Sequence, residues 1–264
     1  MSHHVLVIGG HGKVAQYLTP LLLRRAWSVT SLIRDPSQVP AIEALRPPSG
    51  DGIGKLDVLV RSLEDVRSEA QAKAILDDVR PDYVVWSAGA GGKGGPERTL
   101  AIDRDAAVHF IRAAAATPSV TRFLMVSYLA SRRARPAWWD DEAWKAAGQI
   151  NEALATYYQC KIVADEVLYE ESRRRGPGFV GINLRPGTLS MEPAGGVALG
   201  KTARVTGTVS REAVARVADL LLASEGVRNS WLDMLDGEED AEAAVERVVG
   251  EGVDAAEGDP VYEG

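Results

Sequence analysis

The 264-residue chain is long enough to bury a substantial core, either as one large α/β domain or as two small ones. Its formal net charge of −7 argues against a nucleic-acid or membrane partner, because both usually require a basic surface. The single cysteine, Cys160, excludes an intrachain disulfide, and no apolar run approaches the ~18 residues of a membrane span. The first predicted strand begins at Val5, which leaves no room for a signal peptide, so we expect a soluble cytoplasmic protein.

Short apolar runs alternate with longer amphipathic stretches along most of the chain. The runs predict strands at 5–8, 28–33, 56–60, 83–86, 122–127 and 179–184. The amphipathic stretches predict helices at 13–25, 66–79, 97–116 and 151–174. Most runs lack in/out alternation, as expected for parallel strands that are covered on both faces. The order therefore predicts an α/β fold with a Rossmann-type, doubly wound parallel sheet.

The pattern loosens after residue 185. A long Gly- and Pro-rich loop, with room for a short hairpin, precedes a helix that Ser210 would cap. A last strand at 230–237 and a last helix at 238–249 follow. No linker divides the chain, so we expect residues 1–250 to form a single domain with a small C-terminal lobe after residue 185. The acidic segment 251–264 is predicted to be poorly ordered.

A glycine turn follows the first predicted strand. Gly9 and Gly12 stand where a dinucleotide-binding fold needs a tight turn and a close approach of the backbone to a pyrophosphate. Ala15 takes the place of the third glycine, which allows the helix to pack near the sheet. The same pattern also occurs at ordinary strand–turn–helix corners, but its position within a βαβ unit favours a nucleotide site.

The second predicted strand ends at Arg34 and Asp35. An arginine at this position suits the 2′-phosphate of NADP, whereas an acid suits the ribose hydroxyls of NAD. Asp35 precedes a proline and can simply begin a turn, while Arg34 can simply be a solvated charge. We favour NADP.

Tyr157 and Lys161 lie four residues apart and so share one face of a predicted helix. A nearby ammonium group lowers the pKa of a tyrosine, which can then exchange a proton with a substrate oxygen. The lysine is also free to bond the ribose of a cofactor. The spacing alone is commonplace, and only its combination with the glycine turn and the parallel sheet is informative.

Seven short motifs extend this combination over residues 5 to 235: IGGHGKVA, LIRDPSQ, SAGAGGKGG, FLMVSYLAS, YYQCK with ADEVL, INLRPGTLSMEPAGG and VSREAVARV. In this order they resemble the atypical branch of the short-chain dehydrogenase/reductase superfamily, which includes NmrA-like, flavin-reductase-like and fungal NAD(P)-binding proteins. The resemblance implies an NAD(P)-binding domain, with a substrate lobe after residue 185.

The resemblance also implies a role for each matching residue. The cofactor-binding set would be Gly9, Gly12, Lys13 and Val14 at the pyrophosphate, Arg34 at the 2′-phosphate, Ser62 and Leu63 beside adenine, Ser87, Ala88, Gly89 and Ala90 along the ribose, Lys161 at the ribose, and Pro186, Gly187 and Leu189 over the nicotinamide. The catalytic set would be Ser127, Tyr157 and Lys161. Ser127 precedes Tyr157 by 30 positions, slightly more than is usual in the superfamily. Atypical members have often lost part of the catalytic set.

These residues predict an NADP-dependent reductase of a carbonyl or similarly polarised small molecule, with Tyr157 as proton donor. An isomerase or epimerase that uses the same site, and a non-catalytic NADP-binding sensor of NmrA-like type, are the alternatives. The histidines stand apart from any carboxylate or cysteine at ligand spacing, so no metal is expected. Classical relatives often form homodimers and atypical ones monomers, and the sequence does not decide between them.

Three tryptophans, Trp138, Trp139 and Trp144, lie between Ser127 and the Tyr–Lys helix. They either pack on the domain as part of a surface excursion or form an apolar wall or lid over the substrate. Both interpretations stay open at this point.

Overall fold

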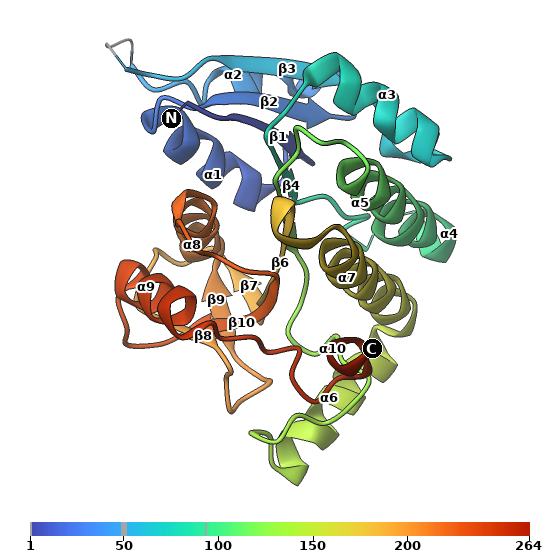
Figure 1. Cartoon of the computed structure of the whole chain (residues 1–264), viewed down its shortest axis with the longest axis vertical. Coiled ribbons are helices and arrows are strands. Elements are labelled where there is room, and N and C mark those ends of the chain that lie inside the picture. The colour runs from blue at the N-terminus through green and yellow to red at the C-terminus, as the bar shows by residue number, and fades with distance from the viewer. Residues whose placement is uncertain (1, 49–51, 93) are drawn as a thin grey trace.

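A central sheet carries the fold (Figure 1). The computed structural model describes residues 2–48, 52–92 and 94–264. The sheet has eight strands in the order β3-β2-β1-β4-β5-β6-β10-β8. The strands in this sheet are β1 (His4–Ile8), β2 (Ser28–Ile33), β3 (Leu56–Val60), β4 (Tyr83–Trp86), β5 (Arg122–Val126), β6 (Val180–Pro186), β8 (Val197–Gly200) and β10 (Ser230–Asp236). Every neighbouring pair is parallel except β10 and β8, so the predicted fold class is confirmed.

Helices cover both faces of the sheet. They are α1 (Lys13–Arg24), α2 (Val39–Glu43), α3 (Glu69–Val79), α4 (Gly95–Thr99), α5 (Ala107–Ala115), α6 (Asp141–Ala153), α7 (Ala155–Arg175), α8 (Arg211–Ala223), α9 (Ala241–Glu251) and α10 (Pro260–Glu263). One core joins α1, α8 and α9 to the sheet, and a second joins α3, α5 and α7 to the opposite face. Among the described residues, no helix is long and apolar enough to cross a membrane.

Two predicted helices differ in detail from the structure. The helix predicted at 97–116 is interrupted by a π-helical segment, Leu100–Ala106, between α4 and α5. The helix predicted at 151–174 begins later, as α7, and α6 directly precedes it. The two are separated at Leu154, whose φ of −113° and ψ of 31° leave the α-helical range.

The segment after residue 185 pairs differently from the expected hairpin. Strands β7 (Thr188–Ser190) and β9 (Thr208–Ser210) lie parallel in a small sheet of their own, and β8 lies antiparallel to β10. Ser210 caps α8 as predicted, because its hydroxyl accepts a hydrogen bond from the Ala213 amide. Because α8 directly follows β9, the small sheet holds the start of α8 close to β7.

The C-terminal segment packs onto the domain, which differs from the poor order expected from its acidic composition. Ala255 and Ala256 are fully buried beside Tyr169 and Trp231. The Asp254 carboxylate accepts hydrogen bonds from the Tyr169 hydroxyl at 2.7 Å and from the Trp231 amide at 2.9 Å. Burial of the two alanines and the hydrogen bonds of Asp254 stabilise the ordered segment despite its acidic composition.

Candidate active site

The glycine turn after β1 is closely packed. Gly9 has a φ of +84°, and a Cβ atom at this position would lie 2.7 Å from the Cα of Ala88. A Cβ on Gly12 would lie 3.0 Å from the Gly9 carbonyl oxygen and 3.3 Å from that of Ser87. The Gly9 contact and its positive φ require glycine, and the Gly12 contacts leave little room for a side chain, so the turn can lie against the end of β4.

The first turn of α1 presents its amides at this turn. The helix begins at Lys13, with Gly12 in the N-cap position, and no side chain in the described chain caps it. The free N–H groups and the helix dipole at such an end favour a negatively charged group. The local structure thus fits the diphosphate of a dinucleotide.

Two cavities adjoin over the carboxyl ends of the strands. The larger holds about 730 Å³ and contains Ser127 and Tyr157 in its wall, and the smaller holds about 620 Å³ and contains Arg34. Their shared wall is made of Gly12, Lys13, Ser87, Ala88, Gly89, Ala90, Gly91 and Arg211. Lys93, in the same glycine-rich loop, lies outside the described residues. The two adjoining cavities, together called the trough, lie at the switch point of the sheet, where doubly wound folds bind ligands.

Arg34 and Asp35, the two candidates for recognising the cofactor ribose, differ in their relation to the smaller cavity. Arg34 is exposed and lines the cavity with Ser62 and Leu63. Asp35 instead accepts a hydrogen bond from the Ser37 amide at 2.8 Å. Hydrogen bonding to the side chain and then to the backbone of Ser37 lowers the pKa of the Asp35 carboxyl group. Asp35 therefore begins the turn, as one interpretation of the sequence held, and Arg34 faces the cavity.

Arg211 lies in the shared wall, although the sequence assigned it no role. It is the first residue of α8, and its Nη1 donates to the carbonyl oxygens of Leu189 at 2.8 Å and Ser190 at 2.9 Å. The β7–β9 pair thus holds the guanidinium group at the junction of the cavities. Only the motif VSREAVARV, which contains Arg211, drew attention to this position in the sequence.

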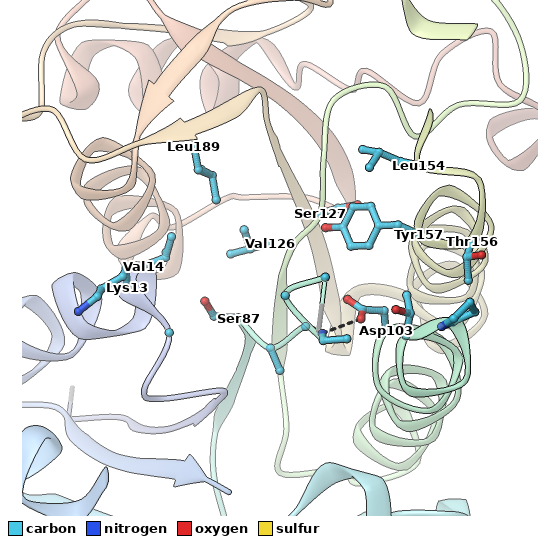
Figure 2. Close-up of a pocket in the computed structure, with 18 of the residues that line it drawn as sticks. Lys13, Val14, Ser87, Asp103, Val126, Ser127, Leu154, Thr156, Tyr157 and Leu189 are labelled. Atoms are coloured by element: carbon cyan, nitrogen blue, oxygen red, sulfur yellow. Dashed lines mark hydrogen bonds between the residues drawn. The ribbon is translucent and has the colours of Figure 1, made fainter. Parts of the chain in front are cut away.

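Ser127 and Tyr157 meet in the larger cavity. Figure 2 shows the Tyr157 ring extending from α7 into the cavity beside Ser127, which follows β5. The ring of Tyr128 lies 5.1 Å from that of Tyr157. The Ser127 hydroxyl donates to Oδ2 of the fully buried Asp165 at 2.7 Å. This bond fixes the orientation of Ser127 and leaves its oxygen as an acceptor.

The pKa of Tyr157 moves opposite to the expected direction. Burial, and then the carboxyl groups of Asp103 and Asp165, raise the pKa of Tyr157 above its usual range. The expectation that Lys161 lowers it is therefore wrong for this arrangement. A phenol with a raised pKa stays protonated near neutral pH, so Tyr157 is held in the form that can donate a proton.

Lys161 is buried beneath the site rather than lining it. Its ammonium group donates to the Val126 carbonyl oxygen at 2.9 Å, and only 1% of the residue is exposed. The charge lowers the pKa of both Asp103 and Asp165, against the larger upward effect of burial. The spacing predicted that Lys161 and Tyr157 share one face of the helix, but it did not show that this face is buried at Lys161.

Asp103 is a further buried carboxyl group in the wall of the larger cavity. It lies in the π-helical segment, and its Oδ2 accepts a hydrogen bond from the Ala90 amide at 2.8 Å. A Cβ on Gly89 would come within 2.9 Å of its Oδ1. Asp103 therefore ties the glycine-rich loop after β4 to the helix that packs on α7.

Pro186 and Gly187 lie away from both cavities. The Gly187 amide donates to the Met234 carbonyl oxygen at 2.9 Å, and the Pro186 carbonyl oxygen accepts from Leu129 at 3.0 Å. These backbone bonds hold them in the sheet. Of the predicted nicotinamide-side residues, Leu189 lines the larger cavity. The other predicted cofactor residues, apart from Lys161, line one or both cavities.

The junction of α6 and α7 forms a wall that the sequence did not indicate. Residues 152–156 all line the larger cavity. The tryptophans lie behind this wall: Trp139 is 2% exposed, and its Nε1 donates to the Thr202 carbonyl oxygen at 2.8 Å. Trp138 and Trp144 pack around the same core. The three rings anchor α6 to the domain, and none of them lines either cavity.

Comparisons with known proteins place the chain among nucleotide-binding proteins. The model of a family described as NAD(P)H-binding matches residues 9–225. The chain is 33% identical over 236 residues to UPF0659 protein C216.03 of Schizosaccharomyces pombe, covering 88% of this chain and 89% of the relative. It is 28% identical over 235 residues to a Bacillus subtilis protein named as an uncharacterized sugar epimerase, YhfK, covering 89% and 94%.

A solved structure shows the same fold. It is a Bacillus halodurans protein whose name assigns it provisionally as an NAD-dependent epimerase/dehydratase, with a TM-score of 0.72 and 25% identity. The match covers 93% of this chain and all of that one. The expected resemblance to atypical short-chain dehydrogenases/reductases is thereby confirmed, and the chain belongs to the NAD(P)H-binding family.

Proposed function

We propose that the protein is an NADP-dependent reductase of a carbonyl or similarly polarised small molecule. The carrying observation is the trough, whose adjoining cavities bring the glycine turn and Arg34 next to Ser127 and Tyr157. A dinucleotide in the trough would set its diphosphate at the shared wall. Its reactive ring would then lie in the larger cavity, near the hydroxyl groups of Ser127 and Tyr157.

When bound, the cofactor supplies a hydride to the carbonyl carbon and is itself oxidised. Tyr157 donates its phenolic proton to the carbonyl oxygen, so the product is an alcohol. Ser127 lies beside the phenol, and its hydroxyl proton, which Asp165 accepts in this structure, would turn to the carbonyl oxygen of the substrate. Lys161 acts from below, since it holds the Val126 carbonyl and with it the end of β5.

A non-catalytic sensor is the second candidate, because two side chains of the predicted catalytic set already have hydrogen-bond partners within the protein. The Ser127 hydroxyl is already bonded to Asp165, and Lys161 is bonded to Val126. A panel of aldehydes, ketones, quinones and flavins with NADPH separates the candidates. A reductase oxidises NADPH with at least one compound, whereas a sensor binds NADPH and oxidises it with none.

The names of two relatives, one a sugar epimerase and the other an epimerase/dehydratase, also bring an epimerase into consideration. An epimerase would interconvert a nucleotide sugar without net consumption of the cofactor. Incubation with NADP or NAD and a UDP-sugar, followed by chromatography of the sugar, tests this activity. We expect no interconversion.

Arg34 should determine the preference for NADPH over NADH. Loss of a charge-assisted contact to the 2′-phosphate is worth ~1.5–3 kcal/mol, so Arg34→Ala should narrow the preference by roughly ten- to a hundredfold. Calorimetric titration with both cofactors measures the change. Equal affinities in the wild type would remove the NADP assignment. If Arg61→Ala narrowed the preference for NADPH and Arg34→Ala did not, the 2′-phosphate would be assigned to Arg61, a neighbouring arginine of the same cavity.

Arg211 should contribute to binding of NADPH and NADH alike, because both carry the diphosphate that would lie at the shared wall. We expect Arg211→Met to weaken each by roughly ten- to a hundredfold, and Arg211→Lys to restore part of the loss. Titration with 2′-AMP, which lacks a diphosphate, should be unaffected.

The matched control for Arg211 is Arg216→Met on the same helix. The Arg216 side chain is 42% exposed and pairs with Asp240 and Glu242, away from both cavities. We expect this variant to bind both cofactors normally. A loss of 2′-AMP affinity in Arg211→Met would instead indicate general damage to the site.

A further inference from the structure

The part of the larger cavity beyond the shared wall has a distinct composition. Its apolar side chains come from Val14, Pro96, Val126, Leu154 and Leu189. With a dinucleotide across the shared wall, this part would face the reactive ring. It is therefore the space that remains for a substrate.

Leu154 is the most exposed large apolar residue of this space. It is 46% exposed and stands at the break between α6 and α7. Figure 2 shows it beside Tyr157, on the same side of the cavity. The Leu154 amide donates to the Ile150 carbonyl oxygen at 3.0 Å, and the Tyr158 amide donates to the Leu154 carbonyl oxygen at 2.8 Å, so backbone hydrogen bonds span the break. A substrate next to the Tyr157 hydroxyl would cover this side chain and remove its apolar surface from water.

The charges of this space disfavour an anion. Within the described residues, the charged side chains that line it are the carboxyl groups of Asp103 and Glu152, with no lysine or arginine. Lys13 and Arg211 stand at the shared wall, where the cofactor diphosphate would engage them. An anionic substrate would lose its hydration without gaining a cationic partner, which is costly.

The wall is also held in place from behind. Trp139 and Ala147 are buried in the core that joins α6 to Leu235, and Trp139 is bonded to Thr202. An apolar surface on such a fixed support selects its ligand by shape and polarity rather than by refolding around it.

We propose that the substrate is a largely apolar carbonyl compound without negative charge, and that Leu154 is a specificity-determining residue that contacts it. The proposal rests on the proposed reductase function. It excludes nucleotide sugars and carboxylated carbonyl compounds as preferred substrates.

A matched pair of aldehydes tests the proposal. With NADPH, kcat/KM for para-methylbenzaldehyde should exceed that for para-carboxybenzaldehyde by at least about tenfold, because only the second must bury a carboxylate. Leu154→Ser should lower kcat/KM for the methyl compound by roughly tenfold, since a partly buried leucine side chain accounts for about that factor. Glu152→Lys should raise kcat/KM for the carboxylated compound relative to that for the methyl compound, because it supplies a cationic partner for the carboxylate.

The control is Met191→Ser, which removes a 57% exposed apolar side chain outside the cavity walls. It should change neither rate. Equal rates for the two aldehydes, or an unaffected Leu154→Ser variant, would overturn the proposal.

Binding separates this proposal from the reductase itself. In the presence of NADP, the neutral dye Nile red should bind the wild type and should bind Leu154→Ser about tenfold more weakly, whereas UDP-glucose should not displace it. Dye binding without turnover of any carbonyl compound would refute the reductase but retain an apolar ligand site. Displacement by UDP-glucose would overturn the inferred ligand class even if a reductase activity is found.

Discussion

Replacing Tyr157 by phenylalanine should lower turnover by roughly 10²–10⁴-fold, the usual contribution of a general acid. The substitution keeps the ring that contacts Tyr128 and removes only the hydroxyl in the cavity. Folding and NADPH affinity should therefore survive. Steady-state rates with any substrate found in the panel, together with calorimetric titration of NADPH, measure the two effects.

Tyr158→Phe is the neighbouring control. The Tyr158 hydroxyl donates to the Arg132 carbonyl oxygen at 2.9 Å, away from the cavity, so its loss should cost about 1 kcal/mol of stability and little activity. Because burial raises the pKa of Tyr157, the wild type should keep its proton donor from neutral pH to beyond the usual value of about 10. Full activity in Tyr157→Phe would remove the proposed chemistry and leave a cofactor site.

The sheet was predictable from the sequence because parallel strands have a strong local signal. Each is a short run of apolar residues, and in the structure Leu6, Val84 and Leu124 are fully buried. The glycine turn was equally visible, since Gly9 requires a positive φ and Gly12 a close backbone contact. Both features depend on a few consecutive residues.

The far side of the site was less predictable because it depends on contacts between distant segments. Arg211 reaches the shared wall only through the pairing of β7 with β9, which joins residues 20 positions apart. The cavity wall at 152–156 depends on the tryptophan core behind α6. Helical spacing likewise placed Lys161 beside Tyr157, but it could not show that the lysine lies under β5.

A buried chain of charges connects the site to the C-terminal segment. Asp165, which holds Ser127, lies 3.4 Å from Nη1 of Arg185. Arg185 Nε donates to Asp233 at 3.0 Å, and Arg132 lies 3.8 Å from the other oxygen of that carboxylate. All four charged side chains are inaccessible to solvent. Arg132 continues the chain by bonding the Ala255 carbonyl oxygen.

Asp233→Ala should therefore be strongly destabilising. It leaves two buried guanidinium groups without their shared partner, and removal of one member of a buried ion pair costs about 3–5 kcal/mol. Burial already lowers the pKa of Arg132 to about 10 in the intact chain, because the buried guanidinium charge is poorly solvated. Loss of Asp233 removes a negative charge that partly offsets this cost. Urea denaturation should show this loss in the free energy of unfolding, and Tm should fall on the order of 10 °C.

The same substitution at an exposed pair isolates the effect of burial. Asp77 pairs with Lys73 at 2.6 Å on the surface of α3, and Asp77→Ala should change the free energy of unfolding by no more than about 0.5 kcal/mol. Because Asp233 lies between Arg185 and Arg132, its loss should also loosen the C-terminal segment, which native-state hydrogen exchange at Ala255 and Ala256 detects. If Asp233→Ala were as mild as Asp77→Ala, the chain of charges would not support the site, and the packed tail would be held by its apolar contacts alone.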